Sequence, residues 1–155
     1  MDRDELIYKT IQLATENVKN GGGPFGAAVV KNGEIIATGT NHVTATLDPT
    51  AHAEVVAIRK ACQVLGHFEL TGCEIYCSCE PCPMCLGAIY WSRPERVFFA
   101  ATAAAAAEAG FDDSFIKGQI SLSYAEQRLS IAQLKHNLAL APFQAWKAKP
   151  DKIEY

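Results

Sequence analysis

A chain of 155 residues has room for one compact domain and little more. Its hydrophobic share of 49% and charged share of 20% are those of a globular protein with a buried core, and they exclude an intrinsically disordered chain. The formal net charge of -3 argues against nucleic acid as the standing partner, since proteins that bind a duplex or tRNA normally carry a basic surface.

No targeting or membrane-spanning segment is expected. The start of the chain is charged and no apolar segment follows it, which disfavours a secretory signal. The longest apolar run, Val97 to Ala107, is too short to cross a bilayer. We therefore expect a cytoplasmic protein with no membrane partner. In that reducing compartment, the 6 cysteines favour metal ligands or buried thiols over disulfides.

Residues 1–40 predict a helix followed by a hairpin. Apolar side chains at helical spacing indicate a helix over residues 4–19, which the following glycines end. The residues that carry this spacing are Leu6, Ile7, Ile11, Ala14 and Val18. Two expected strands, over 25–30 and 34–40, flank Asn32-Gly33, a dipeptide typical of a type I′ hairpin turn.

Helices and strands then alternate up to about residue 101. Asp48 is a good N-cap and Pro49 suits the first helical position, so a helix is expected to begin there. The later elements are a helix over 49–65, a strand over 73–77, a helix from Pro81 to before Pro94, and a strand over 97–101. Past Gly110 the pattern weakens: residues 130–138 fit a last strand or an irregular segment, and residues 142–148 a short helix. The alternation is typical of a three-layer α/β domain with a mixed sheet.

Two short segments carry the residues best suited to chemistry, Thr50-Ala-His52-Ala-Glu54 and Cys79-Glu-Pro-Cys82-Pro-Met-Cys85. Each opens a predicted helix. Cys82 and Cys85 place two thiolates on one face of a helix start, where backbone N–H groups favour negative charge. His52 from the other helix brings the number of protein ligands to three, which leaves the fourth tetrahedral position of a zinc ion open to water, as in catalytic sites.

Glu54 follows His52 closely enough to serve a water at this metal without having to ligate it. A carboxylate there can take the proton of the water and pass it to a ring nitrogen and then to a leaving amine. The combined H-x-E…P-C-x-x-C pattern is that of zinc deaminases acting on nucleobases.

Each part of this pattern also has a plainer interpretation. Cys82 and Cys85 alone would equally fit a redox pair or half of a structural zinc site, and His52 alone a packed or capping residue. Cys79 is a competing ligand, but it lies before Pro81 and outside the helix start, so it stays unassigned. The full pattern, with Glu54 and the prolines, favours the catalytic interpretation.

The two motifs lie within a longer set of segments that has the pattern of a known family. These segments are Gly22 to Ala27, Asn41, Asp48 to Val55, Ser78 to Trp91, Gly110 to Ile116 and the closing Glu154-Tyr155. Together they resemble the short bacterial guanine deaminases of the cytidine and deoxycytidylate deaminase superfamily, over nearly the whole chain. The zinc motifs are common to the superfamily and say nothing about the base. The Gly110-Phe-Asp-Asp113-Ser segment and Tyr155 are what point to guanine.

The resemblance implies a cytidine-deaminase-like α/β/α fold with a central five-stranded mixed sheet, one Zn2+ ion per subunit, and hydrolysis of guanine to xanthine and ammonia. It implies that His52, Cys82 and Cys85 are the metal ligands and that Glu54 is the catalytic residue. The residues implied to bind the purine base are Phe25, Asn41, Ala53, Trp91, Asp113 and Tyr155. The partner subunit would supply Tyr155 in a homodimer whose C-terminal segments, within a single domain over 1–155, are exchanged.

Several alternatives stay open. Guanosine or another aminated ring, such as a triazine or cytosine, is the nearest alternative substrate. A tRNA adenosine deaminase shares the zinc motifs but is disfavoured by the negative charge, and a non-catalytic zinc-binding module has no need of Glu54. The run Ala103–Ala107 departs from the family pattern, which has polar residues there. Contacts of those side chains to substrate or partner are therefore not carried over.

Overall fold

The computed structural model describes residues 1–155, which separate into two compact units, Met1–Asp113 and Ser114–Tyr155. The first unit holds the whole sheet and all the residues of the two motifs. None of the described helices has the length and apolar character needed to span a membrane.

A four-stranded mixed sheet with the order β2-β1-β3-β4 forms the centre of the first unit. Its strands are β1 (Gly26–Lys31), β2 (Glu34–Thr40), β3 (Cys73–Cys79) and β4 (Arg96–Ala101). β1 pairs antiparallel with β2 and β3, whereas β3 pairs parallel with β4. The turn between β1 and β2 has positive φ at Asn32 (52°) and Gly33 (77°), as the predicted type I′ hairpin requires.

The mixed sheet is confirmed, but the prediction of five strands is wrong for this chain. Residues 130–138 form no strand. They belong to the second unit, which contains no other strand to pair with, and an extended segment without a ladder partner leaves its backbone groups to water. β4 consequently has a neighbouring strand on one side only.

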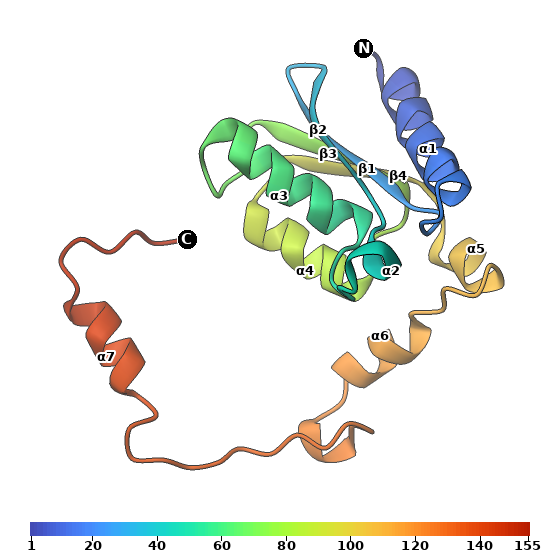
Figure 1. The fold of residues 1–155 in the computed structure, drawn as a ribbon. Coiled ribbons are helices and arrows are strands. Elements are labelled where there is room, and N and C mark those ends of the chain that lie inside the picture. Colours follow the sequence, from blue (N-terminus) through green and yellow to red (C-terminus); the bar gives the residue numbers. More distant parts are fainter. The chain divides into compact units, whose positions relative to one another are not determined.

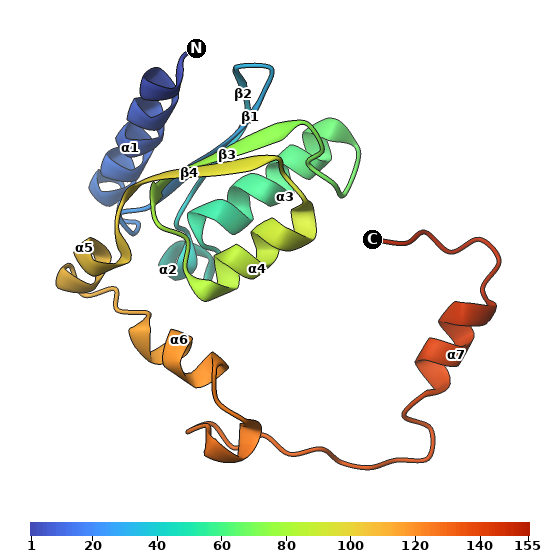
Figure 2. The same cartoon turned by 180° about the vertical axis from the view of Figure 1, so that it is seen from behind.

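Helices cover both faces of the sheet (Figure 1). The helices of the first unit are α1 (Arg3–Lys19), α2 (Val43–Thr46), α3 (Ala53–Leu65), α4 (Pro83–Ser92) and α5 (Ala103–Glu108). α1 lies on one face, and α3 and α4 lie together on the other, which the view from behind confirms (Figure 2). Side chains alternate along β1 accordingly: Val29 packs in the core under α3, and Val30 packs with Leu6 of α1.

The start of α3 differs from the prediction by one turn. The helix begins at Ala53 with His52 as its N-cap, not at Pro49. Asp48 is the reason, because its Oδ1 atom accepts hydrogen bonds from the backbone N–H (2.9 Å) and the hydroxyl (2.7 Å) of Thr50. The carboxylate therefore closes a local turn instead of capping a helix. The shift places His52 at a helix start.

α3 approaches the sheet closely because β2 carries Gly39. A Cβ atom at this position would lie 2.2 Å from the carbonyl oxygen of Ala53 and 2.5 Å from the backbone nitrogen of Ala57. Only a residue without a side chain allows the two backbones to come so near. The residues of α3 that face the sheet are small and buried, namely Ala53, Ala57 and Ala61.

The buried stripe of α1 is more polar than the sequence predicts. Thr10 and Asn17 are buried in it, whereas Ile11 and Val18 are 40% and 51% exposed. These two apolar residues line a hollow of about 550 Å³ together with alanines of α5. Their helical spacing therefore places them along this hollow and not in the core.

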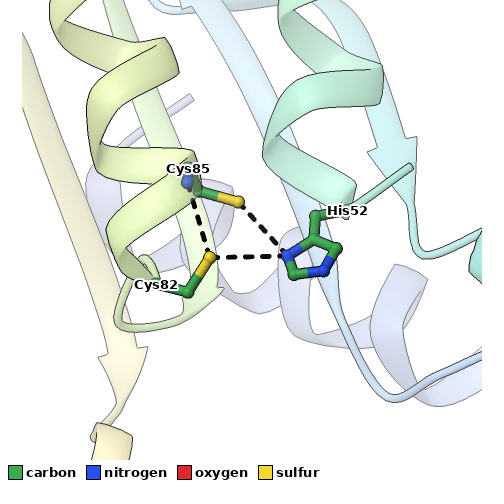
Figure 3. Close-up of side chains that lie close together, drawn as sticks. All are labelled: His52, Cys82 and Cys85. Carbon is green, nitrogen blue, oxygen red and sulfur yellow. Dashed lines mark hydrogen bonds between the residues drawn. The ribbon is translucent and has the colours of Figure 1, made fainter. Parts of the chain in front are cut away.

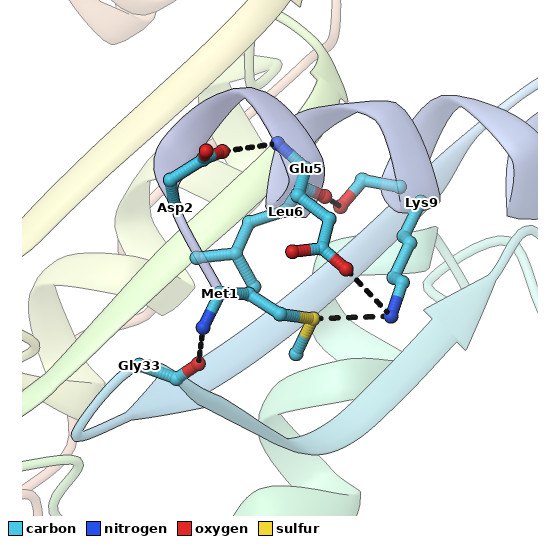
Figure 4. A network of polar contacts seen from close by, with 7 residues as sticks. Met1, Asp2, Glu5, Leu6, Lys9 and Gly33 are labelled. Atoms are coloured by element: carbon cyan, nitrogen blue, oxygen red, sulfur yellow. Dashed lines mark hydrogen bonds and ion pairs between the residues drawn. The ribbon is translucent and has the colours of Figure 1, made fainter.

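The N-terminus of α1 is held by a small polar network (Figure 4). The Asp2 carboxylate accepts the backbone N–H of Glu5 at 2.8 Å, which caps the helix, and the Lys9 ammonium lies 3.4 Å from the Glu5 carboxylate. The Met1 amino group donates to the carbonyl of Gly33 at 3.1 Å. The helix start is thereby joined to the hairpin turn.

The second unit contains α6 (Ser114–Ile120), a 3-10 turn at Tyr124–Glu126, and α7 (Ala141–Ala148). α7 confirms the short helix predicted over 142–148. No residue from 114 to 155 is buried, although many are apolar. Exposed members of this set include Phe115, Ile120, Leu129, Leu134, Leu140, Phe143 and Tyr155.

Candidate active site

The N-terminal ends of α3 and α4 bring together His52, Cys82 and Cys85 (Figure 3). The Nδ1 atom of His52 lies 3.5 Å from the Sγ atom of Cys82 and 3.4 Å from that of Cys85. All three possible ligand atoms are within 4.8 Å of one another. Tetrahedral zinc with ordinary bond lengths separates a sulfur and a nitrogen ligand by roughly 3.5 Å, so the set fits this metal.

Local backbone structure places the two cysteines. Cys82 is the N-cap of α4 in extended conformation, and Pro83 occupies the first turn of the helix. The Sγ atom of Cys82 accepts the backbone N–H of Cys85 at 3.4 Å. A thiolate at this position also benefits from the positive end of the helix dipole. The Cys-Pro-Met-Cys sequence therefore positions both sulfur atoms at the start of α4.

The pKa values of the two thiols are shifted in opposite directions. Hydrogen bonds from Cys85 and from His52 hold the pKa of Cys82 down, to about 4. The hydrogen bond to Cys82, together with burial, raises the pKa of Cys85. The hydrogen bond to Cys82 also raises the pKa of His52. Without a cation, the side chains of Cys82, Cys85 and His52 are joined by hydrogen bonds. A bound cation favours the deprotonated form of both thiols.

Glu54 lies beside the three ligands and is buried, with 6% of its surface exposed. Its Oε2 atom accepts a hydrogen bond from the Sγ atom of Cys85 at 3.1 Å. Burial raises the pKa of the carboxyl group. A buried carboxyl group beside these three side chains is suited to take up and release protons.

Other segments of the first unit carry the residues predicted to bind the base. The rings of Phe25 and Phe111 meet edge to face, with centroids 4.9 Å apart. The Oδ1 atom of Asn41 accepts the backbone N–H of Val43 at 3.2 Å, so the NH2 group is the donor that this side chain has left to offer. Ala53 is fully buried at the start of α3. These segments provide an aromatic edge and a hydrogen-bond donor.

Asp113 interacts electrostatically with Cys79, the last residue of β3. The pKa of the Cys79 thiol is raised mainly by burial, and the Asp113 carboxylate is among the acidic groups that add to this effect. Cys79 itself is outside the three-ligand set, and its Sγ atom donates to the carbonyl of Thr102 at 3.6 Å. It is therefore not placed as a metal ligand.

Two predicted substrate residues are not brought to this centre within the first unit. Trp91 lies at the far end of α4, six residues after Cys85, and is 65% exposed. At 1.5 Å of rise per residue, it is about 9 Å farther along the helix axis. Tyr155 belongs to the second unit and is 70% exposed.

Three residues that contact the segments around Phe25 and Asn41 were not singled out from the sequence. Phe111 was hidden within a longer matching segment. Ser78 accepts the backbone N–H of Gly26 through its Oγ atom at 3.0 Å, and Asn17 bonds two loop carbonyls. The available signal was a polar side chain within a buried stripe or strand, which in a protein core needs a hydrogen-bond partner.

The sequence belongs to a known family. Residues 1–101 match the cytidine and deoxycytidylate deaminase zinc-binding region. Over the whole length of both chains, the sequence is 54% identical to guanine deaminase of Bacillus subtilis. It is 43% identical to the tRNA-specific adenosine deaminase of Aquifex aeolicus, over 65% of this chain and 67% of that one.

Solved structures agree with this grouping. The X-ray structure of the Bacillus subtilis guanine deaminase matches with a TM-score of 0.98, covering 100% of this chain and 99% of that one. A guanine deaminase from Nitrosomonas europaea, at 34% identity, matches with a TM-score of 0.70 over 72% of this chain and 65% of that one. The chain therefore belongs to the cytidine and deoxycytidylate deaminase family and, within it, groups with the bacterial guanine deaminases.

Proposed function

We propose that the protein catalyses the hydrolysis of guanine to xanthine and ammonia. The observation that carries this proposal is the extent of the likeness. The match to a guanine deaminase spans the whole chain, whereas the match to a tRNA-specific adenosine deaminase spans 65% of it. The identity to the guanine deaminase, 54% against 43%, is also the higher of the two.

His52, Cys82 and Cys85 would hold one zinc ion, as their separations and their donor atoms allow. When bound, zinc acidifies water and stabilises negative charge that develops on the substrate. Two thiolates and one neutral imidazole complete a ligand set that leaves room for one further ligand. The helix N-termini that carry these residues help to keep the thiols deprotonated.

Glu54 moves the protons of the reaction. Its carboxylate accepts a proton from the attacking water and delivers it to N3 of the ring, while the water oxygen adds to C2. It then carries the remaining proton of the new hydroxyl group to the amine, and the C–N bond breaks to release ammonia. Burial beside Cys85 keeps the carboxylate away from bulk water and supports this exchange.

The base is held by groups that complement guanine. The NH2 group of Asn41 is a donor and suits the O6 and N7 acceptors of the purine. The Asp113 carboxylate is an acceptor and suits the N–H groups that guanine presents on its other edge. Phe25, backed by Phe111, offers an aromatic wall for the flat ring. Adenine has no N1–H and would leave a carboxylate unmatched, which disfavours it.

Residues 114–155 are proposed to be exchanged between two copies of the chain, so that Tyr155 of one copy closes the site of the other. This unit buries none of its apolar residues by itself. The first unit also has an open strand edge at β4 and an apolar hollow between α1 and α5. A second copy would cover these surfaces. Trp91 remains a proposed base contact through the family resemblance alone.

One experiment tests the reaction itself. The zinc-loaded protein is incubated with guanine in water enriched in 18O, and the product is analysed by mass spectrometry. Hydrolysis predicts xanthine that carries one labelled oxygen atom, with one ammonia released for each xanthine. Unchanged guanine in the presence of bound zinc would refute the proposed substrate, and unlabelled xanthine would refute direct attack by water.

A further inference from the structure

Asn17 lies in the buried stripe of α1 and is 8% exposed. Its Nδ2 atom donates to the carbonyl of Gly23 at 2.8 Å and to the carbonyl of Asn41 at 2.9 Å. A primary amide has two N–H donors, so both of them are used on these two carbonyls. One side chain thereby joins the glycine-rich loop after α1 to the segment that follows β2.

The two carbonyls belong to segments that carry proposed base contacts. The carbonyl of Gly23 also accepts the backbone N–H of Phe25 at 2.9 Å, and the carbonyl of Phe25 accepts the backbone N–H of Asn41 at 3.2 Å. Asn17, Gly23, Phe25 and Asn41 thus form one closed hydrogen-bonded ring. Any shift of the Asn17 amide moves both the aromatic wall and the amide donor of the base pocket.

The loop is shaped around this amide. A Cβ atom on Gly22 would lie 2.3 Å from the Nδ2 atom of Asn17, and one on Gly23 would lie 3.1 Å from the Cγ atom of Asn41. The backbone N–H of Gly22 also donates to the carbonyl of Asn17 at 2.8 Å. The close approach of Asn17 therefore requires a glycine at position 22, and the approach of Asn41 favours one at position 23.

From this geometry we infer that Asn17 is a positioning residue for the base pocket, which sets the places of Phe25 and Asn41 without touching the substrate. This inference rests on the proposed function, because it takes the base to bind at these two residues. It predicts that Asn17 governs base binding and leaves the metal centre unchanged, since the metal ligands come from other elements.

The test compares Asn17→Asp with Thr10→Val by steady-state kinetics on guanine. Asn17→Asp keeps the size of the side chain, but it removes both donors and sets carboxylate oxygens against two carbonyls. The Asn41 carbonyl then loses the Asn17 donor, the half-buried Gly23 carbonyl keeps only the backbone N–H of Phe25, and both face a carboxylate. KM is therefore expected to rise about tenfold or more, with kcat within about threefold and zinc content unchanged. Thr10 is buried in the same stripe and bonds only the carbonyl of Leu6 in its own helix, so Thr10→Val is expected to leave KM unchanged.

Gly22→Ala provides a second route that keeps Asn17 in place. Its Cβ atom would displace the amide, and the same rise in KM is expected. In the double variant Asn17→Ala/Gly22→Ala the collision is gone, so KM should be no higher than in Asn17→Ala alone. Should Asn17→Asp not fold, as judged by its melting transition, the KM values of Gly22→Ala, Asn17→Ala and the double variant still test the inference.

A further comparison asks whether Asn17 acts through Asn41. In an Asn41→Ala background, Asn17→Asp is expected to raise KM by much less than tenfold. The backbone carbonyl of residue 41 is still there, but the side-chain amide that Asn17 positions through it has been removed. An unchanged KM in both Asn17→Asp and Gly22→Ala would overturn the inference, as would a full effect in the Asn41→Ala background. If the wild type does not act on guanine, the proposed function fails, and the same variants are compared on whichever base the wild type deaminates.

Discussion

The Nδ1 atom of His52 lies 3.4 Å from the Sγ atom of Cys85, although the two residues are 33 positions apart and lie at the starts of different helices. The sheet produces this meeting. α3 follows β2 and α4 follows β3, and both helices lie on the same face with their N-terminal ends together. Two helix starts, each with unpaired backbone N–H groups, favour anionic ligands and hence a cation between them.

The first prediction concerns the metal. His52→Ala removes one of three ligands, and zinc bound after dialysis is expected to fall well below one ion per subunit, measured by atomic emission. Cys79→Ala is the matched control, because Cys79 is buried nearby but lies outside the set. It should retain zinc fully. Loss of zinc from Cys79→Ala with retention in His52→Ala would mean that the ligand set is wrong.

Replacing Glu54 by Gln separates chemistry from metal binding. The amide keeps the size of the side chain but cannot accept a proton, and general acid–base catalysis typically contributes about 100-fold to 10,000-fold. We expect kcat to fall by at least about 100-fold, with zinc content and melting temperature preserved. Glu69→Gln removes a carboxylate that pairs with Arg93 on the surface and should leave kcat unchanged. Turnover of Glu54→Gln near the wild-type rate would exclude Glu54 as the proton carrier.

Gly39→Ala tests the close approach of α3 to the sheet. The added methyl group would collide with the backbone of Ala53, so α3 must move and the free energy of unfolding is expected to fall by about 1–3 kcal/mol or more. Gly87→Ala, on an exposed turn of α4 with open space around it, should instead raise the free energy of unfolding by about 0.5–1 kcal/mol. Denaturant unfolding measures both. Equal stability of the two variants would contradict the packing described for Gly39.

Mixing two inactive variants tests the proposed exchange of the C-terminal unit. Glu54→Gln retains Tyr155, and Tyr155→Ala retains Glu54. If Tyr155 comes from the partner, one site of each mixed dimer is complete, and co-expression in equal amounts is expected to restore about one quarter of wild-type activity. Each variant alone should stay inactive. No recovery from demonstrated mixed dimers would show that Tyr155 acts within its own chain, or not at all.

Much of the site could be predicted from the sequence, because its chemistry depends on residue type and short spacing. The H-x-E and P-C-x-x-C motifs identify the cluster that the structure assembles at two helix starts. The alternation of helices and strands gave the mixed sheet and its two covered faces for a similar reason, since side-chain periodicity reports which face is buried.

The remaining features depend on contacts that spacing does not record. Asp48 uses its carboxylate on Thr50 and not on a helix start, so α3 begins one turn later than its capping signal indicates. Ile11 and Val18 have the spacing of core residues but line a surface hollow. The prediction of a fifth strand was wrong because residues 130–138 have no strand to pair with inside their own unit.

The most direct test of the central claim is ammonia release by the purified, zinc-loaded protein with guanine, guanosine, adenine, cytosine and ammeline assayed in parallel. The proposed function predicts the highest kcat/KM for guanine, with a margin of at least about 100-fold over adenine, because adenine has neither the O6 acceptor that suits Asn41 nor the N1–H donor that suits Asp113. Guanosine presents the same base edge as guanine, so its kcat/KM reports whether the pocket also admits a ribose on N9. Preferred turnover of a different ring would contradict the substrate while leaving the metal chemistry in place. No ammonia release from any of the five compounds, with zinc bound, would contradict the proposed base pocket.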